Sequence, residues 1–299
     1  MTKKTWWIVH ILIVTLFFGC SSGKQLTQIQ NEAQADFSSG DFAKALSGFE
    51  GIISNYEEQG KSKECPVYSQ AGIAAYNLGD LTKALDYLQK AVNTSFADEQ
   101  TYITMAHAYR NIDNLSLEIE TLEKFIEKYP ESIESMPMKI RLFETYVESE
   151  NWQQAYDLWL QIASRVKEDI KYVEDYYFVN RALGNREKAD ELASELLGMN
   201  DENIIGLEHE AKKYYNIAED RYQAEMKAYE AHKTRKQYAA LLKALDEVTD
   251  EFKIALNYFE TLYKIDPKPK YATYIGNIYT RFNDKEKADY YHRLGKKKQ

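Results

Sequence analysis

Histidine spacing in this sequence does not fit a metal site. The five histidines lie far apart, at His10, His107, His209, His232 and His292. A zinc-binding helix of the metalloprotease type needs two histidines at positions i and i+4, with a glutamate after the first. His209-Glu210 begins that pattern, but Lys213 occupies the position of the second ligand. We therefore expect neither a bound metal nor a cofactor.

Motifs for nucleophilic and phosphate chemistry are also missing from the sequence. It contains no Gly-x-Ser-x-Gly elbow, no P-loop and no Gly-x-Gly-x-x-Gly turn. Its 47 Asp and Glu residues make carboxylate pairs common. Acid–base catalysis, however, requires a carboxylate with a shifted pKa in an apolar pocket, and solvated surface charge is the simpler interpretation. We expect that the chain is not an enzyme.

The N-terminal segment has the layout of an export signal. An apolar run from Trp6 to Phe18 follows Lys3 and Lys4, with no acidic residue nearby. The run is shorter than the roughly 20 residues that a helix needs to cross a bilayer core. A basic start, a short apolar stretch and small residues after it are typical of a secretory signal peptide. We therefore expect residues 1–19 to be cleaved.

Cys20 is the residue at which covalent modification is expected. The hexapeptide Phe17-Phe18-Gly19-Cys20-Ser21-Ser22 resembles a bacterial lipobox. The resemblance implies cleavage before Cys20, diacylation of its thiol (palmitate included), and a lipidated tether over residues 20–25. The sorting rule of that family implies the outer membrane, because no aspartate follows the cysteine; the periplasmic and surface faces both stay open. An ordinary signal peptide with an incidental cysteine is the alternative.

Composition limits the partners of the remaining chain. The sequence has 38 basic and 47 acidic residues and a formal net charge of −9. Loss of residues 1–19 removes two lysines and no acidic residue, which makes the chain more acidic still. Nucleic acid and anionic lipid both attract basic proteins, so we expect no nucleic-acid partner and membrane attachment only through the lipid. Cys65 would be the single remaining thiol, which excludes an intramolecular disulfide.

A repeated turn organises the sequence after residue 26. Residues 36–49, 72–91 and 276–292 share a Gly-Asp or Asn-Asp pair followed by an alanine at the same spacing. A small residue precedes the pair in each repeat, at Ala33, Gly72 and Gly276. Glycine accepts the left-handed conformation that ends one helix, and aspartate caps the start of the next. Each segment therefore predicts two antiparallel helices, with small residues where they cross and large side chains beside the crossing.

These segments resemble the tetratricopeptide repeat (TPR), a helix pair of about 34 residues. Related patterns at 109–130, 146–162, 181–189 and 252–267 extend the resemblance, which implies an all-α, right-handed α-solenoid of about seven to eight hairpins. The packing positions that it implies are Gly40, Ala45, Phe49, Gly72, Tyr76, Gly79, Ala84, Leu88, Gly184, Ala189, Ala255, Phe259, Gly276 and Ala288.

One stretch interrupts the regular pattern. Residues 203–233 have no glycine or proline after Gly206, and their apolar residues follow steps of three and four. Such spacing predicts one long helix, and a degenerate hairpin is the alternative. We thus expect an N-terminal TPR block at 26–200, the long or degenerate helix at 201–235, a C-terminal TPR block at 236–295 and a basic tail at 296–299.

Stacked helix hairpins offer an extended surface and little loop material for catalysis. The resemblance implies a lipid-anchored scaffold or adaptor of a cell-envelope complex, with other envelope proteins as partners. A glycan-binding outer-membrane lipoprotein built on TPR helices is the alternative. Tyr274 and Asn277 are the candidate groove residues. Asn277 alone matches the Lys–Asn pair that TPR carboxylate clamps use, because Ser69, Ile73 and Thr273 stand at the other positions.

Overall fold

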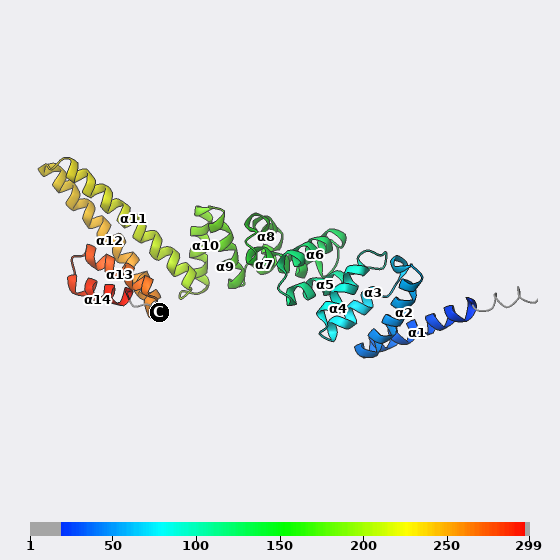
Figure 1. The fold of residues 1–299 in the computed structure, drawn as a ribbon. Helices are drawn as coiled ribbons and strands as arrows, with labels where there is room; N and C mark the ends of the chain where they lie inside the picture. Colours follow the sequence, from blue (N-terminus) through cyan, green and yellow to red (C-terminus); the bar gives the residue numbers. More distant parts are fainter. Residues whose placement is uncertain (1–18, 297–299) are drawn as a thin grey trace, which may run out of the picture. The chain divides into compact units, whose positions relative to one another are not determined.

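The computed structural model describes residues 19–296 and divides them into two compact units, one ending at Glu150 and the other beginning at Asn151. The predicted signal peptide lies outside the described residues up to residue 18, as do the last three residues of the predicted tail. Within the described range every regular element is a helix, which confirms the predicted all-α class (Figure 1). None of the helices in that range is long and apolar enough to span a bilayer.

The first unit contains three antiparallel hairpins and one further helix. In chain order these are α1 (Gly19–Ser39), α2 (Phe42–Glu58), α3 (Tyr68–Asn77), α4 (Leu81–Ala91), α5 (Glu99–Asn111), α6 (Leu115–Lys128) and α7 (Ser135–Glu148), with a short 3-10 helix at Ser62–Glu64. The pairs α1/α2, α3/α4 and α5/α6 pack as hairpins, and each hairpin contacts the next helix along the chain. We expected residues 20–25 to form a tether. In the structure they belong to helix α1, which contains no proline that would interrupt it.

The second unit also contains three hairpins and one further helix, and two of its helices are much longer than the rest. It contains α8 (Trp152–Val166), α9 (Ile170–Ala182), α10 (Arg186–Met199), α11 (Ile204–Ala231), α12 (Arg235–Ile265), α13 (Pro269–Arg281) and α14 (Lys285–Gly295). The hairpins are α9/α10, α11/α12 and α13/α14, while α8 packs on α9, α10 on α11 and α12 on α13. The helices thus have the TPR-type arrangement that the repeated turn predicts.

The turns follow the predicted chemistry. Three glycines take the left-handed conformation, with φ of 83° at Gly40, 79° at Gly79 and 77° at Gly184. Asp41 and Asp80 then accept the backbone N–H three residues later, at 3.3 and 3.0 Å, and so cap α2 and α4. In the last hairpin Asn283 takes the left-handed position and Asp284 caps α14. A local signal of four residues therefore determines where each of these helix pairs turns.

The crossings within hairpins depend on small residues. A Cβ added at Gly72 would lie 2.6 Å from Leu88 Cγ, and one added at Gly276 would overlap the ring of His292. Tyr76 is half-buried at the edge of its hairpin and accepts a hydrogen bond from Asn111. The remaining packing positions in the helices are buried: Ala45, Phe49, Ala84, Leu88, Ala189, Ala255, Phe259 and Ala288.

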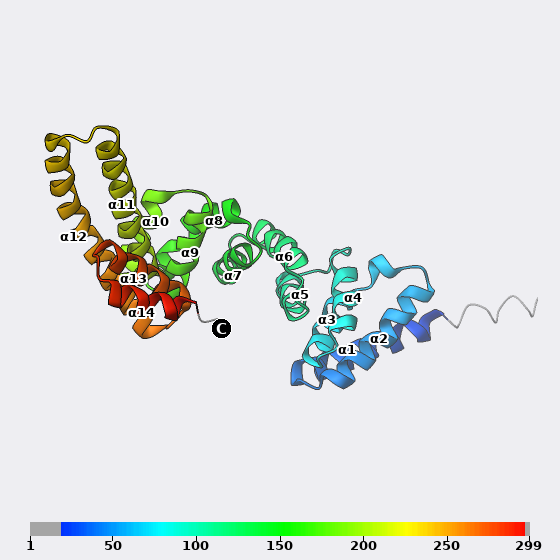
Figure 2. The same cartoon turned by 60° about the vertical axis from the view of Figure 1, so that its left-hand side comes forward.

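The hairpin of α11 and α12 differs from the others in length. Helix α11 has 28 residues and α12 has 31, and neither contains proline. Ala218, where a degenerate hairpin would turn, is instead buried among Val248 and Phe252 of α12. Sequence patterns identified only the second half of α12, because residues 235–251 carry no turn signal of their own. Figures 1 and 2 show the loop end of this hairpin standing clear of α13 and α14.

Candidate binding cleft

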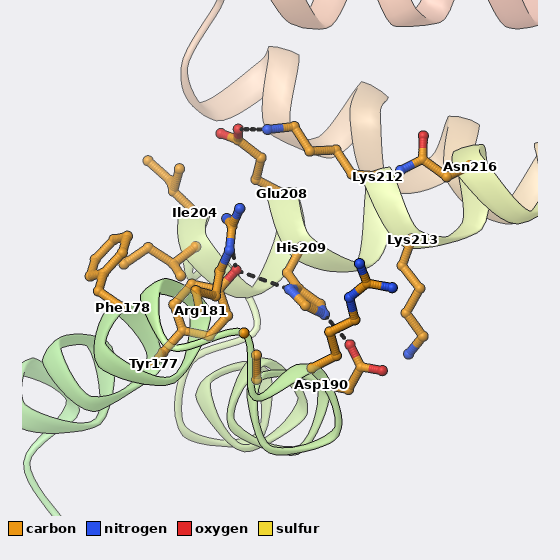
Figure 3. Close-up of a pocket in the computed structure, with 14 residues that line it drawn as sticks. Tyr177, Phe178, Arg181, Asp190, Ile204, Glu208, His209, Lys212, Lys213 and Asn216 are labelled. Carbon is orange, nitrogen blue, oxygen red and sulfur yellow. Dashed lines mark hydrogen bonds and ion pairs between the residues drawn. The ribbon is translucent and has the colours of Figure 1, made fainter. Parts of the chain in front are cut away.

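A cleft of about 630 Å³ opens between α9, the α9–α10 turn, α10 and the first half of α11 (Figure 3). Its lining combines basic, acidic and apolar side chains from three helices. They are Tyr177, Phe178, Arg181, Gly184, Arg186, Ala189, Asp190, Ile204, Ile205, Glu208, His209, Lys212, Lys213 and Asn216. Because the cleft lies within one unit, its geometry follows from hairpin packing alone.

A chain of hydrogen bonds joins the three helices at the base of the cleft. The Tyr177 hydroxyl lies 2.9 Å from Nδ1 of His209, and Nε2 of His209 lies 2.6 Å from Oδ1 of Asp190. Burial raises the pKa of Tyr177, although a hydrogen bond from Arg181 acts in the opposite direction. The protonated hydroxyl can therefore donate to Nδ1, which leaves Nε2–H to donate to Asp190. His209 thus ties helices together, and no metal-ligand cluster is found among the described residues.

A second network of hydrogen bonds neutralises the charge of Glu208, which lines one wall of the cleft. Lys212 and Lys270 donate to its carboxylate at 2.5 and 2.7 Å, and the Tyr271 hydroxyl donates at 2.6 Å. Burial alone would raise the pKa of Glu208, but these hydrogen bonds outweigh it and lower the pKa to about 2. Lys213 is similarly paired with Glu210, at 3.1 Å. The cleft lysines are therefore already engaged.

Two arginines at the cleft have no such partner. The side chains of Arg181 and Arg186 are exposed, and no carboxylate of the described residues forms an ion pair with either. Arg181 donates a hydrogen bond to Tyr177, with Nη1 3.4 Å from the hydroxyl and the guanidinium 5.8 Å from the ring centre. A guanidinium offers a planar fork of donors that matches a carboxylate. The cleft therefore presents two guanidiniums that have no carboxylate partner among the described residues.

Apolar side chains lie next to these arginines. Phe178 on α9 is 43 % exposed and Ile204 at the start of α11 is 36 % exposed. Figure 3 shows them on the same side of the cleft as Arg181. An exposed aromatic ring and an exposed branched side chain beside free guanidiniums match the composition of binding hot spots, where aromatic and Arg residues are enriched.

The predicted groove residues lie elsewhere in the second unit. Tyr274 on α13 stacks on Phe259 at 4.5 Å between ring centres and meets Tyr215 edge-on at 4.9 Å. Asn277 donates to the hydroxyl of Tyr215 at 3.4 Å. Both residues thus take part in packing between helices, and neither lines the cleft. The sequence signal for the cleft was the pair of arginines that flanks the turn at Gly184, which we had interpreted only as a turn.

Comparisons with known proteins concern the fold. No protein-family model matches the chain, and no curated protein matches it in sequence. The C-terminal part of a TPR repeat-containing protein from Cytophaga hutchinsonii is 16% identical, covers 88% of this chain and 93% of its own, and has a TM-score of 0.49. A tetratricopeptide repeat protein from Parabacteroides merdae is 12% identical, with coverage of 91% and 92% and a TM-score of 0.44. YrrB, a TPR protein with an unusual peptide-binding site, is 14% identical, with coverage of 60% and 89% and a TM-score of 0.46.

Proposed function

We propose that this chain is a scaffold that binds partner proteins, and that the cleft on α9, α10 and α11 is one of its contact surfaces. The observation that supports this proposal is the pair of unpaired guanidiniums, Arg181 and Arg186, beside exposed Phe178 and Ile204. The cleft volume, about 630 Å³, suits a few side chains of a partner segment rather than a folded domain.

The chemistry of the lining defines the partner segment. Each arginine can hold a carboxylate through two parallel N–H···O bonds, which are stronger than bonds between neutral groups. Phe178 and Ile204 would bury a large apolar side chain next to that carboxylate. Glu208 and Asp190 already accept hydrogen bonds from side chains of this protein. They therefore repel an acidic segment less strongly than free carboxylates would. The fitting partner is therefore an extended segment with an acidic residue near a bulky apolar one.

The scaffold is further proposed to be tethered to the cell envelope, at the outer membrane, by a lipid on Cys20. Support comes from the apolar run Trp6–Phe18 and from Gly19-Cys20 at its end. More than one acyl chain is needed for stable anchoring, and a diacylated cysteine meets that requirement. The partners are then other envelope proteins, and the chain carries out no catalysis of its own.

Crosslinking in intact cells, followed by purification from detergent-solubilised envelopes, tests the scaffold proposal. We expect wild type to recover a reproducible protein partner and Arg181→Glu/Arg186→Glu to recover at least about tenfold less, because two repulsive charges replace two attractive ones. The matched control is Arg165→Glu/Arg293→Glu, which changes two exposed arginines outside the cleft lining. Equal recovery by the cleft variant would show that the cleft does not bind the partner.

A glycan array tests the alternative function, that of a glycan-binding lipoprotein. Glycan-binding TPR lipoproteins need long aromatic insertions between repeats, whereas the helices of the second unit are joined by short connections. We therefore expect no glycan binding. Binding of one glycan class, together with no reproducible protein partner, would replace the scaffold by a glycan-binding protein.

A further inference from the structure

The loop end of the α11–α12 hairpin, residues 227–243, is here called the hairpin tip. The main buried cluster of this unit ends at Ala218 on α11 and Val248 on α12, and beyond it α12 buries only Ala244 and Leu241. From Ala218 to the end of α11 at Ala231 the helix rises about 20 Å. Figures 1 and 2 both show the tip beyond the other helices of its unit. The tip is therefore an arm that projects from the core.

The charge of the hairpin tip is opposite to that of the chain. The whole protein has a formal net charge of −9, yet the tip contains a single acidic residue, Glu230. Its five basic residues are Lys227, Lys233, Arg235, Lys236 and Lys243. All five are exposed, and none forms an ion pair with a carboxylate of the described residues. A strongly basic surface is thus concentrated at the end of an arm.

Apolar side chains accompany these charges. Tyr238 and Leu242 lie one turn apart on α12 and are 49 % and 47 % exposed. Tyr238 also contacts Tyr229 of α11, with ring centres 5.7 Å apart. Tyrosine favours the membrane–water interface, and lysine reaches headgroups with its long apolar stem. Protein interfaces, by contrast, are depleted in lysine, which supplies four of the five charges.

We propose that the hairpin tip binds the surface of a membrane that contains anionic phospholipid, with Tyr238 and Leu242 at headgroup level. The acidic parts of the chain do not prevent this contact. For the three central cations, Lys233, Arg235 and Lys236, the nearest acidic residues beyond the tip are Glu225 and Asp246. These lie about 14 and 18 Å along the helix axes from the apex at Thr234. Both distances exceed the Debye length of about 8 Å at physiological salt. The electrostatic potential at the hairpin tip is therefore positive, although the net charge of the chain is negative.

Amide hydrogen exchange of residues 227–243 tests this inference. The full-length chain, held in nanodiscs of neutral phosphatidylcholine, is titrated with vesicles that contain about 30% phosphatidylglycerol. We expect exchange in the tip to slow as anionic vesicles are added, and not with neutral vesicles. Lys233→Gln/Arg235→Gln/Lys236→Gln should raise the lipid concentration at half-protection on the order of 100-fold, since each basic residue near the surface contributes about a factor of five. Salt at about 0.5 M should abolish the protection.

The matched control is Lys264→Gln/Lys285→Gln/Arg293→Gln, which removes two lysines and one arginine from exposed positions outside the tip. It should leave the titration unchanged, and circular dichroism should show equal helix content for all three proteins. Equal protection by neutral and anionic vesicles, or an equal loss in both triple variants, overturns the inference. So does protection of the tip by polyglutamate but not by anionic vesicles, which would assign it to an acidic protein.

Discussion

At the scale of single residues, charged side chains that hold the fold together differ from those available to a ligand in one respect. The former have a partner of opposite charge within the protein, and the latter do not. Glu118 on α6 is 1 % exposed and accepts a hydrogen bond from Nε of Arg141 on α7 at 2.7 Å. Glu208 is held by three donors. Arg181 and Arg186 have no such partner, and it is this difference that identifies them as groups for a ligand. Residue type alone would not distinguish Arg141 from Arg181.

The Glu118–Arg141 pair yields a prediction of stability. Arg141→Leu leaves the buried carboxylate of Glu118 without its guanidinium, and we expect a loss of about 3–5 kcal/mol in the free energy of unfolding. Glu118→Leu/Arg141→Leu should lose less than the single variant, because no charge is then left buried. Urea unfolding measures both. The comparison variant Arg110→Leu breaks an exposed pair with Glu148 and should lose less than about 1 kcal/mol. A double variant less stable than Arg141→Leu would contradict this account.

Glu208 predicts a dependence of stability on pH. Its pKa falls from an ordinary value of 4.5 to about 2 in the folded protein. A lowered pKa stabilises the fold above about pH 4.5, and that stability is lost as the pH falls toward 2. Thermal unfolding should be measured at several pH values between about 4.5 and 2. Over this range the free energy of unfolding of wild type should fall by about 1–2 kcal/mol more than that of Glu208→Gln, a figure that allows for solvent screening. Glu202→Gln, at an exposed position, should follow wild type. Parallel curves for all three proteins would argue against the network.

At the scale of elements, contact distance between the two helices of a hairpin depends on whether the crossing residue has a side chain. Gly72 faces Leu88 and the carbonyl of Ala84 so closely that a Cβ does not fit. Gly51 on α2 is also helical but has no neighbour within 4 Å of its Cβ position. The same residue type therefore has a packing role in one helix and none in the other.

These two glycines should respond in opposite directions to one substitution. Gly72→Ala forces α3 and α4 apart and should destabilise the protein by about 1–3 kcal/mol. Gly51→Ala replaces a flexible residue of α2 by one with a higher helix propensity, and it should stabilise the protein by up to about 1 kcal/mol. Chemical denaturation of the two variants beside wild type gives both values. If Gly72→Ala is as stable as wild type, the crossing is looser than the distances indicate.

At the scale of the whole molecule, the proposed location depends on one thiol. The chain has two cysteines. Cys65 is buried and unpaired, and burial raises the pKa of its thiol, so it is a poor nucleophile. Cys20 directly follows the predicted export signal. Covalent attachment to the membrane is therefore expected at Cys20 only.

Metabolic labelling with palmitate tests this expectation in cells. Cys20→Ala should abolish incorporation of the label and change the electrophoretic mobility of the protein. Cys65→Ala should retain both label and membrane fractionation, because this thiol lies inside the first unit. A Cys20→Ala protein that keeps its label, or that stays in the membrane fraction with unchanged mobility, would show that Cys20 is not the site of a lipid anchor.

The sequence by itself determined the class of fold and the places where helices turn. Gly79-Asp80 and its counterparts act within four residues, through backbone conformation and capping, so they can be interpreted without knowledge of the rest of the molecule. The spacing of Ala45 and Phe49 likewise predicted a buried helix face, and both residues are buried. These properties are local, and a one-dimensional pattern is sufficient to define them.

Only the tertiary structure decided which residues meet. Tyr177 and His209 are 32 positions apart, and Asp190 joins them from a third helix. The stacking of Tyr274 on Phe259 and the pairing of residues 235–251 with α11 were equally beyond pattern analysis. Each depends on the rotation and length of two helices packed together, which are set by the sum of contacts along both. For the same reason, charge averaged over the sequence concealed both the unpaired arginines of the cleft and the basic hairpin tip.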